Sequence, residues 1–96
     1  MITKPSSTTT KPIKVTTTGT VSLAAREIVS IHYLNTTGGV GRVDITEVGG
    51  GANEGIAMGA AAQNGTDAWE PAQPQKFNTI IVTFTTGTGV VTIQTN

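Results

Sequence analysis

Residues 27–34 read EIVSIHYL, residues 35–39 read NTTGG, and residues 40–48 read VGRVDITEV. The first run carries apolar side chains on both faces of an extended chain, which predicts a central strand whose residues are mostly buried. The Asn and Gly residues of the middle run accept positive φ values at low cost and indicate a tight turn. The last run alternates apolar and polar side chains. Together the three runs predict a β-hairpin.

Short extended runs separated by glycines continue on both sides of this hairpin. Towards the N-terminus, residues 13–17 and 21–23 alternate with a period of two, and AARE at residues 24–27 indicates a weak turn. Towards the C-terminus, TIIVTFT at residues 79–85 and VVTIQT at residues 90–95 flank a Thr-Gly turn. This pattern predicts a second hairpin.

Between the two hairpins the signal is weaker. Ile56 and Met58 indicate one short strand, whereas QNGTDAWEPAQPQK at residues 63–76 has two prolines and no strand period. We expect that segment to be a long surface loop. The chain as a whole predicts about six to eight short strands, which is typical of a small antiparallel β-sandwich, jelly roll or barrel.

The composition favours the same all-β fold. The 96 residues include nineteen threonines, nine isoleucines and nine valines, and β-branched side chains fit a pleated sheet better than a helix. Leu, Ile, Val and Phe together make up 22 residues, only slightly more than the roughly 20% below which chains usually stay disordered. A thin hydrophobic core is expected, and with it stabilising contacts to other chains.

The length allows one domain. Residues 1–12 read MITKPSSTTTKP and predict an extended N-terminal arm, followed by a β-sandwich domain at residues 13–96. The first ten residues lack the apolar stretch of a signal peptide, and no run of about twenty apolar residues occurs. We therefore expect a soluble protein that is made in the cytoplasm.

The charge balance argues against two classes of partner. Six basic and six acidic residues give a formal net charge of zero, and only 12% of the residues are charged. Proteins that bind nucleic acids or anionic membranes through electrostatics need clustered Lys and Arg, so neither partner is expected. The absence of cysteine excludes disulfides and thiol chemistry.

No set of residues indicates catalysis, a cofactor or a metal site, and the protein is not expected to be an enzyme. His32 lies in the middle of a predicted strand and is interpreted as a structural residue; an active site would need a concave pocket and an acidic neighbour around it. Two GxG sequences lack the third glycine of a phosphate-binding loop and are interpreted as turns.

Trp69 is the most informative single residue, because it is a large aromatic in a polar segment flanked by Pro71. Three roles remain open from the sequence: filling the end of the sandwich, anchoring a partner protein, or stacking on a sugar.

Two stretches of the chain carry a resemblance to a known family. TVSLAAREIVSIHYLNTTGGVGRVDITEVGG at residues 20–50 and PQKFNTIIVTFTTGTGVVTIQTN at residues 74–96 resemble the small β-sandwich structural proteins of tailed bacteriophage virions. The resemblance implies a capsid decoration or cement protein, or a head-fibre or tail-associated subunit. It further implies a homotrimer that binds the major capsid protein on the capsid surface of the virion, and it brings no catalytic residues.

The residues expected to contact the partner lie in the arm and near the tryptophan: Ile2, Lys4, Pro5, Lys11, Trp69 and Pro71. The alternative function is a carbohydrate- or receptor-binding module of a phage fibre or tail. That alternative predicts an exposed Trp69 beside Tyr33 or acidic residues in a groove. The decoration function predicts instead that Trp69 is buried in the fold or in an interface.

Overall fold

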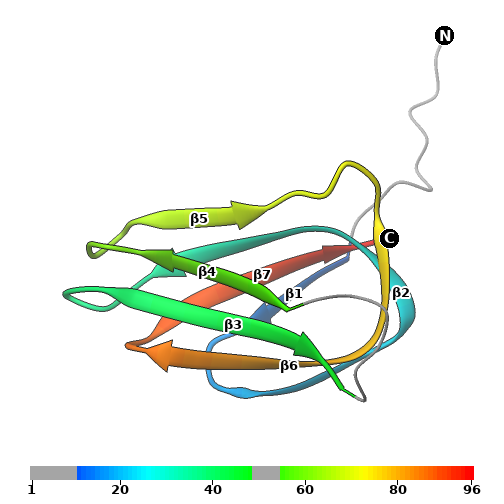
Figure 1. The fold of residues 1–96 in the computed structure, drawn as a ribbon, viewed down its shortest axis with the longest axis horizontal. Helices are drawn as coiled ribbons and strands as arrows, with labels where there is room; N and C mark the ends of the chain where they lie inside the picture. Colours follow the sequence, from blue (N-terminus) through cyan, green and yellow to red (C-terminus); the bar gives the residue numbers. More distant parts are fainter. Residues whose placement is uncertain (1–10, 49–54) are drawn as a thin grey trace, which may run out of the picture.

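The computed structural model describes residues 11–48 and 55–96, and its regular structure is entirely β-strand (Figure 1). The strands, in chain order, are β1 (Lys11–Val15), β2 (Gly19–Asn35), β3 (Gly41–Glu47), β4 (Ile56–Ala60), β5 (Thr66–Trp69), β6 (Gln75–Thr86) and β7 (Gly89–Thr95). The predicted all-β fold is confirmed. Within the predicted arm, residues 1–10 lie outside the described residues, whereas Lys11 and Pro12 belong to the sheet as the start of β1.

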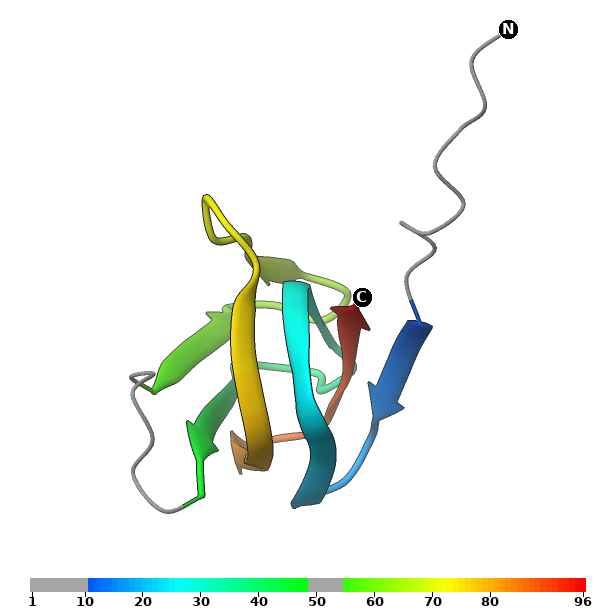
Figure 2. The same cartoon turned by 90° about the vertical axis from the view of Figure 1, so that its right-hand side faces the viewer.

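All strand pairs are antiparallel, in the order β1-β7-β2-β6-β3-β4, and β5 adds to β2. The long strand β2 takes part in two layers. Its first half pairs with β6, and its second half lies between β7 on one edge and β5 on the other. In the end-on view of Figure 2, β1 and β7 lie on one side and β3 and β4 on the other. The result is a small antiparallel β-sandwich.

Both predicted hairpins are wrong in their pairing. Within the described residues, β3 pairs with β4 and β6 rather than with β2, and β6 and β7 each pair with β2 rather than with each other. The turns form where the sequence places them, but each one carries the chain from one layer to the other. An alternating strand followed by a turn has the same sequence signature in a hairpin and in such a crossing.

The weak turn predicted at residues 24–27 is also wrong, because β2 runs through it without a break. Ala24 has a positive φ of 53°, and the register against β6 shifts between Ser22 and Arg26. An irregularity of this kind bends a strand and re-aims its side chains. A second shift, between Ile28 and Ser30 against β7, allows both Ile28 and Ile31 to be buried although they are three residues apart.

The long loop predicted at residues 63–76 contains a strand. Residues Thr66–Trp69 form β5, which pairs with β2 from Leu34 opposite Thr66 to Ile31 opposite Trp69. β6 then begins at Gln75. The four residues of β5 include only one large apolar side chain, so the local sequence gives little sign of a strand.

The core lies between the two layers and draws its buried side chains from five strands, β2, β3, β4, β6 and β7. Its buried apolar residues are Leu23, Ile28, Ile31, Tyr33, Val43, Ile45, Ile56, Met58, Phe77, Ile80, Val82, Val91 and Ile93. The second half of β2 is central, as predicted, but it is buried on its inner face only, since His32 and Leu34 are exposed. Within the described ranges, no helix is long and apolar enough to cross a membrane.

Candidate protein-binding surface

The residues predicted to contact a partner do not form one surface. Ile2, Lys4 and Pro5 lie outside the described residues. Lys11 begins the edge strand β1, whereas Trp69 ends β5 at the opposite edge of the same layer, with β7 and β2 between them. The structure therefore separates the start of β1 from the tryptophan.

Trp69 faces the interior of the sandwich. It lies opposite the buried Ile31 and packs against the core as a half-buried side chain. Its ring meets Phe77 edge to face, with the centroids 6.1 Å apart and the planes at 81°, which is a favourable arrangement for two aromatic rings. This contact favours the role of filling the sandwich and leaves only part of the ring accessible.

The strands β1, β7, the second half of β2 and β5 form one layer of the sandwich, here called the first layer. Its outer face has a shallow hollow beside His32. The hollow has a volume of about 360 Å³ and is lined by Lys14, His32, Tyr33, Leu34, Thr66, Val90 and Thr92. Lys14 lies opposite Thr92, Thr92 lies opposite His32, and Leu34 lies opposite Thr66, so the four adjacent strands β1, β7, β2 and β5 contribute to it. The surface combines an exposed leucine with a lysine, a histidine and hydroxyl groups.

The interpretation of His32 as a residue of a mostly buried strand is corrected by its exposure. Half of its side chain, 51%, is open to solvent, and its Nε2 lies 4.0 Å from Oε2 of Glu70, which is 68% exposed. That distance is too long for a hydrogen bond, and ion pairs at such exposed positions contribute little stability. The pair therefore places hydrogen-bonding groups at the surface, beside the exposed side chain of Leu34.

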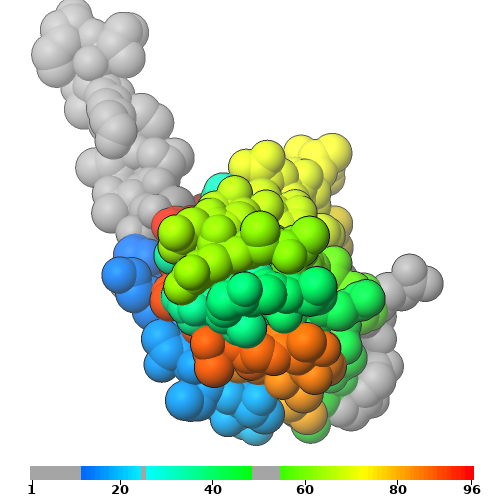
Figure 3. Space-filling view, turned by 90° about the vertical axis from the view of Figure 1, so that its left-hand side faces the viewer, coloured from blue at the N-terminus to red at the C-terminus, as the bar shows by residue number. Residues whose placement is uncertain are grey.

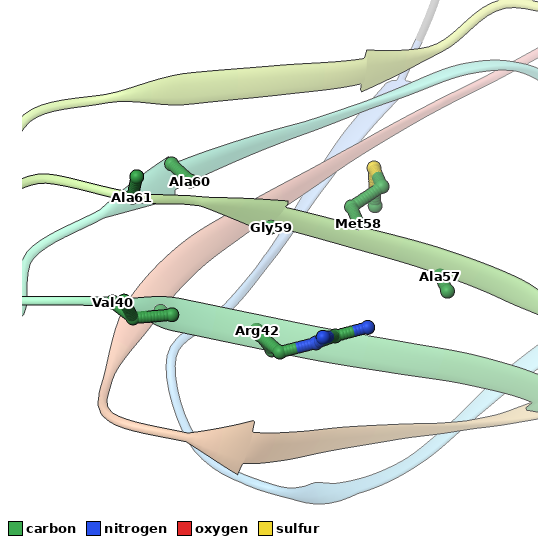
Figure 4. Close-up of a pocket in the computed structure, with 8 residues that line it drawn as sticks. Val40, Arg42, Ala57, Met58, Gly59, Ala60 and Ala61 are labelled. Atoms are coloured by element: carbon green, nitrogen blue, oxygen red, sulfur yellow. The ribbon is translucent and has the colours of Figure 1, made fainter.

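A second hollow lies on the outer face of the other layer, between β3 and β4 (Figure 4). Its volume is about 310 Å³, and its lining includes Val40, Arg42, Ala57, Gly59 and Ala61. Figure 4 shows Arg42 extended along β3, with Val40 near one end of the strand. Val40 is 53% exposed, which makes it the most exposed large apolar side chain of the described residues.

One buried side chain, Asn35, holds together the end of the sandwich that both hollows reach. Its Nδ2 donates to the carbonyl oxygens of Gly39 (2.7 Å), Ala62 (2.9 Å) and Ala60 (3.3 Å), and its Oδ1 accepts from the Thr37 N–H (2.9 Å). Buried polar groups are costly unless they are paired. The Asn35 amide therefore fixes the loop at residues 36–40 relative to the loop at residues 61–65.

The turn between β6 and β7, at residues 87–88, lies at the same end of the molecule and is hydrogen-bonded to the loop at residues 36–40. Thr37 Oγ1 donates to the Thr88 carbonyl and accepts from its N–H, and Gly87 between the strands β6 and β7 has a positive φ of 73°. Figure 3 shows the three loops side by side: residues 61–65 in lime, 36–40 in green and 87–88 in orange. The sequence predicts Asn35 only as a turn residue and gives no sign of this buried role.

Tyr33 lies beneath this junction and is fully buried. Among the described residues, its hydroxyl is the only buried side-chain oxygen or nitrogen without a hydrogen-bond partner. Burial raises the pKa of the Tyr33 hydroxyl above its usual 10.0. Because the Tyr33 ring is buried, it offers no accessible face beside Trp69 on which a sugar could stack.

Comparison with known proteins adds no relative to this picture. No protein-family model, no curated protein and no solved structure matches the chain. Across residues 11–48 and 55–96, no group of three or more His, Asp or Glu side chains is arranged to hold a metal ion. The functional argument therefore depends on the surfaces described above.

Proposed function

We propose that the protein is a structural protein of a bacteriophage virion, a decoration or cement protein that binds the assembled shell of major capsid protein as an oligomer. The observation that carries the proposal is the outer face of the first layer. There, Leu34 and Val90 lie next to Lys14 and His32, and the face ends at the edge strand β1. Such a mixture of apolar and polar groups is typical of protein–protein interfaces.

The mechanism is binding linked to assembly. A protein that binds the assembled shell but not the free subunits stabilises the shell in proportion to its occupancy. The free energy of binding would come mainly from apolar contacts such as that of Leu34, because exposed ion pairs made by Lys14 contribute little each.

The residues before β1 extend the proposed contact. Residues 1–10 lead directly into Lys11 at the edge of this face, so Ile2, Lys4 and Pro5 are proposed to bind the shell next to it. Trp69 and Pro71 belong to the opposite edge of the layer, and the packing of the tryptophan against Phe77 gives it a structural part in the domain.

The alternative of a carbohydrate- or receptor-binding module gains no support from the aromatic residues. All four of them are described, and none is among the exposed large apolar side chains. Stacking on a sugar needs an accessible ring face.

Cosedimentation with purified heads of tailed bacteriophages tests the proposal, with three variants beside the full chain. A chain of residues 11–96 and the Leu34→Asp variant should each bind the heads at least tenfold more weakly. Val40→Asp is the matched control, because Val40 is also exposed and apolar but lies on the other layer. Full-length protein that ignores every head preparation, or equal binding by all three variants, would contradict the proposal.

A further inference from the structure

The first half of β2 has a free edge. β6 pairs with one edge of this segment from Gly19 to Ser22, and β7 joins the other edge only from Ile28 onwards. No described segment pairs with that other edge between residues 19 and 26. Figure 2 shows that the neighbouring strand on this side is β1, which pairs with β7 instead. Alternate residues of the segment therefore direct backbone N–H and C=O groups away from the sheet.

The two strands that border this open side differ in how their edges are protected. β1 contains Pro12, which has no N–H, and Lys14, whose charge opposes pairing with another strand. Residues 19–24 read GTVSLA and contain neither proline nor charge. Natural sheets usually block exposed edges with such residues, so an edge without them is suited to receive a strand.

The side chains of this edge also lack full cover. Val21 points inwards and packs against the core but remains only half-buried, and Ile13 and Val15 on β1 are in the same state. On the outer face, Thr20 and Ser22 are exposed. A strand added next to β2 would cover Val21 and bring hydroxyl groups opposite the two outer residues.

We propose that the strand is supplied by a second copy of this chain, so that two β2 strands pair antiparallel along Gly19–Leu23 about a twofold axis at Val21. Thr20 then lies opposite the partner's Ser22, and Gly19 opposite the partner's Leu23. The segment is suited to pair with itself because the pairing brings no two like charges together, and a net charge of zero gives no overall repulsion between copies. The positive φ of Ala24 limits the pairing to these residues.

This inference goes beyond the proposed function, because it needs no shell. A twofold pairing joins copies in pairs, which differs from the trimer that the resemblance implies. Light scattering on the isolated protein separates the two.

Two double variants at the same positions test the register. In T20K/S22K, each lysine lies opposite a lysine of the partner, whereas in T20K/S22E each lysine lies opposite a glutamate. We expect the wild type and T20K/S22E to have the mass of a dimer in light scattering, and T20K/S22K to dissociate at least tenfold more readily. Thr46→Lys, an exposed threonine on the outer face of β3, should leave the dimer unchanged. Circular dichroism checks that every variant is folded.

The pairing would be overturned by a wild type that stays monomeric at millimolar concentration, by a wild type that forms only trimers, or by one mass for all variants. The chain of residues 11–96 supplies a further control. If it loses the dimer, the edge is occupied by the N-terminal segment rather than by β2 of the second copy, and the proposal fails. None of these measurements involves phage heads, so their outcome is separate from that of the head-binding experiment.

Discussion

Both halves of β2 belong to one strand, which bends at Ala24, but the two halves have different surroundings. The second half, Ile28–Asn35, is paired on both edges and buries four side chains. The first half is paired on one edge, and among its side chains whose burial the structure describes, Leu23 is the one that is fully buried. The comparison shows that one strand can anchor the domain at one end and leave an edge open for association at the other. Substitutions in the second half should therefore affect folding most, and those in the first half should affect self-association.

The largest effect is expected for Asn35→Ala. The substitution removes the donor to three backbone carbonyls and the acceptor of the Thr37 N–H. Buried groups left without partners cost about 1–3 kcal/mol each, and we expect the free energy of unfolding to fall by about 3 kcal/mol in urea denaturation. Asn78→Ala, at an exposed position of β6, should change it by less than about 0.5 kcal/mol. Equal losses of stability in Asn35→Ala and Asn78→Ala would contradict the conclusion that the second half of β2 anchors the domain.

The second largest loss of stability is expected at Gly41, which lies against the buried side chains of Tyr33 and Asn35. A Cβ on Gly41 would overlap the Tyr33 hydroxyl and Oδ1 of Asn35, whereas one on Gly38 would meet nothing within 4 Å. Gly41→Ala should lower the free energy of unfolding by about 2 kcal/mol through overpacking. Gly38→Ala should raise it slightly, by about 0.4–1 kcal/mol, because it restricts the unfolded chain. Thermal unfolding of the two variants and the wild type checks that the stability changes have opposite signs.

A smaller effect is expected at Tyr33. Tyr33→Phe removes a buried hydroxyl that has no partner, and we expect it to raise the free energy of unfolding by about 1 kcal/mol. Denaturant titrations of both proteins at neutral pH measure the difference. An unchanged or lower value for the variant would show that the hydroxyl is satisfied in solution.

The same hydroxyl gives a pH dependence. Because burial raises the pKa of Tyr33 in the folded state, the unfolded chain loses this proton first, at about pH 10. Ionisation of Tyr33 therefore leaves the free energy of unfolding unchanged below pH 10 and lowers it as the pH rises further. The wild type should lose stability above pH 10 more steeply than Tyr33→Phe, and the absorbance of the single tyrosine reports the ionisation directly.

The smallest effect on folding is expected in the first half of β2. Thr20→Lys, measured at a concentration where the protein is monomeric, should change the free energy of unfolding by less than about 0.5 kcal/mol, since the side chain is exposed. A loss of more than about 1 kcal/mol in the monomer would mean that this half also anchors the domain.

The predicted strands largely agree with the structure, but their partners do not. Residues 27–34 and 40–48 were expected to pair, and they lie in different layers. Alternation shows which side chains face inwards, as it does for Val43 and Ile45, but it does not specify which strand lies alongside. The strand β5 was missed because its four residues carry too short a pattern.

The candidate surface was predicted less well than the fold. His32 was assigned to a mostly buried strand from its apolar neighbours, yet those neighbours alternate between an inner and an outer face. The buried role of Asn35 depends on a loop more than twenty residues away, and the space available at Gly41 depends on the buried side chains of Tyr33 and Asn35. No local sequence pattern reveals such contacts.

The sequence by itself determined the all-β composition, the places where the chain turns and most of the inward-facing side chains, because these depend on steric preferences of single residues and their immediate neighbours. The tertiary structure decided the pairing of the strands, the bend of β2 at Ala24 and the edge that this bend leaves free. These features depend on burying two faces against each other, and that condition involves residues from the whole chain.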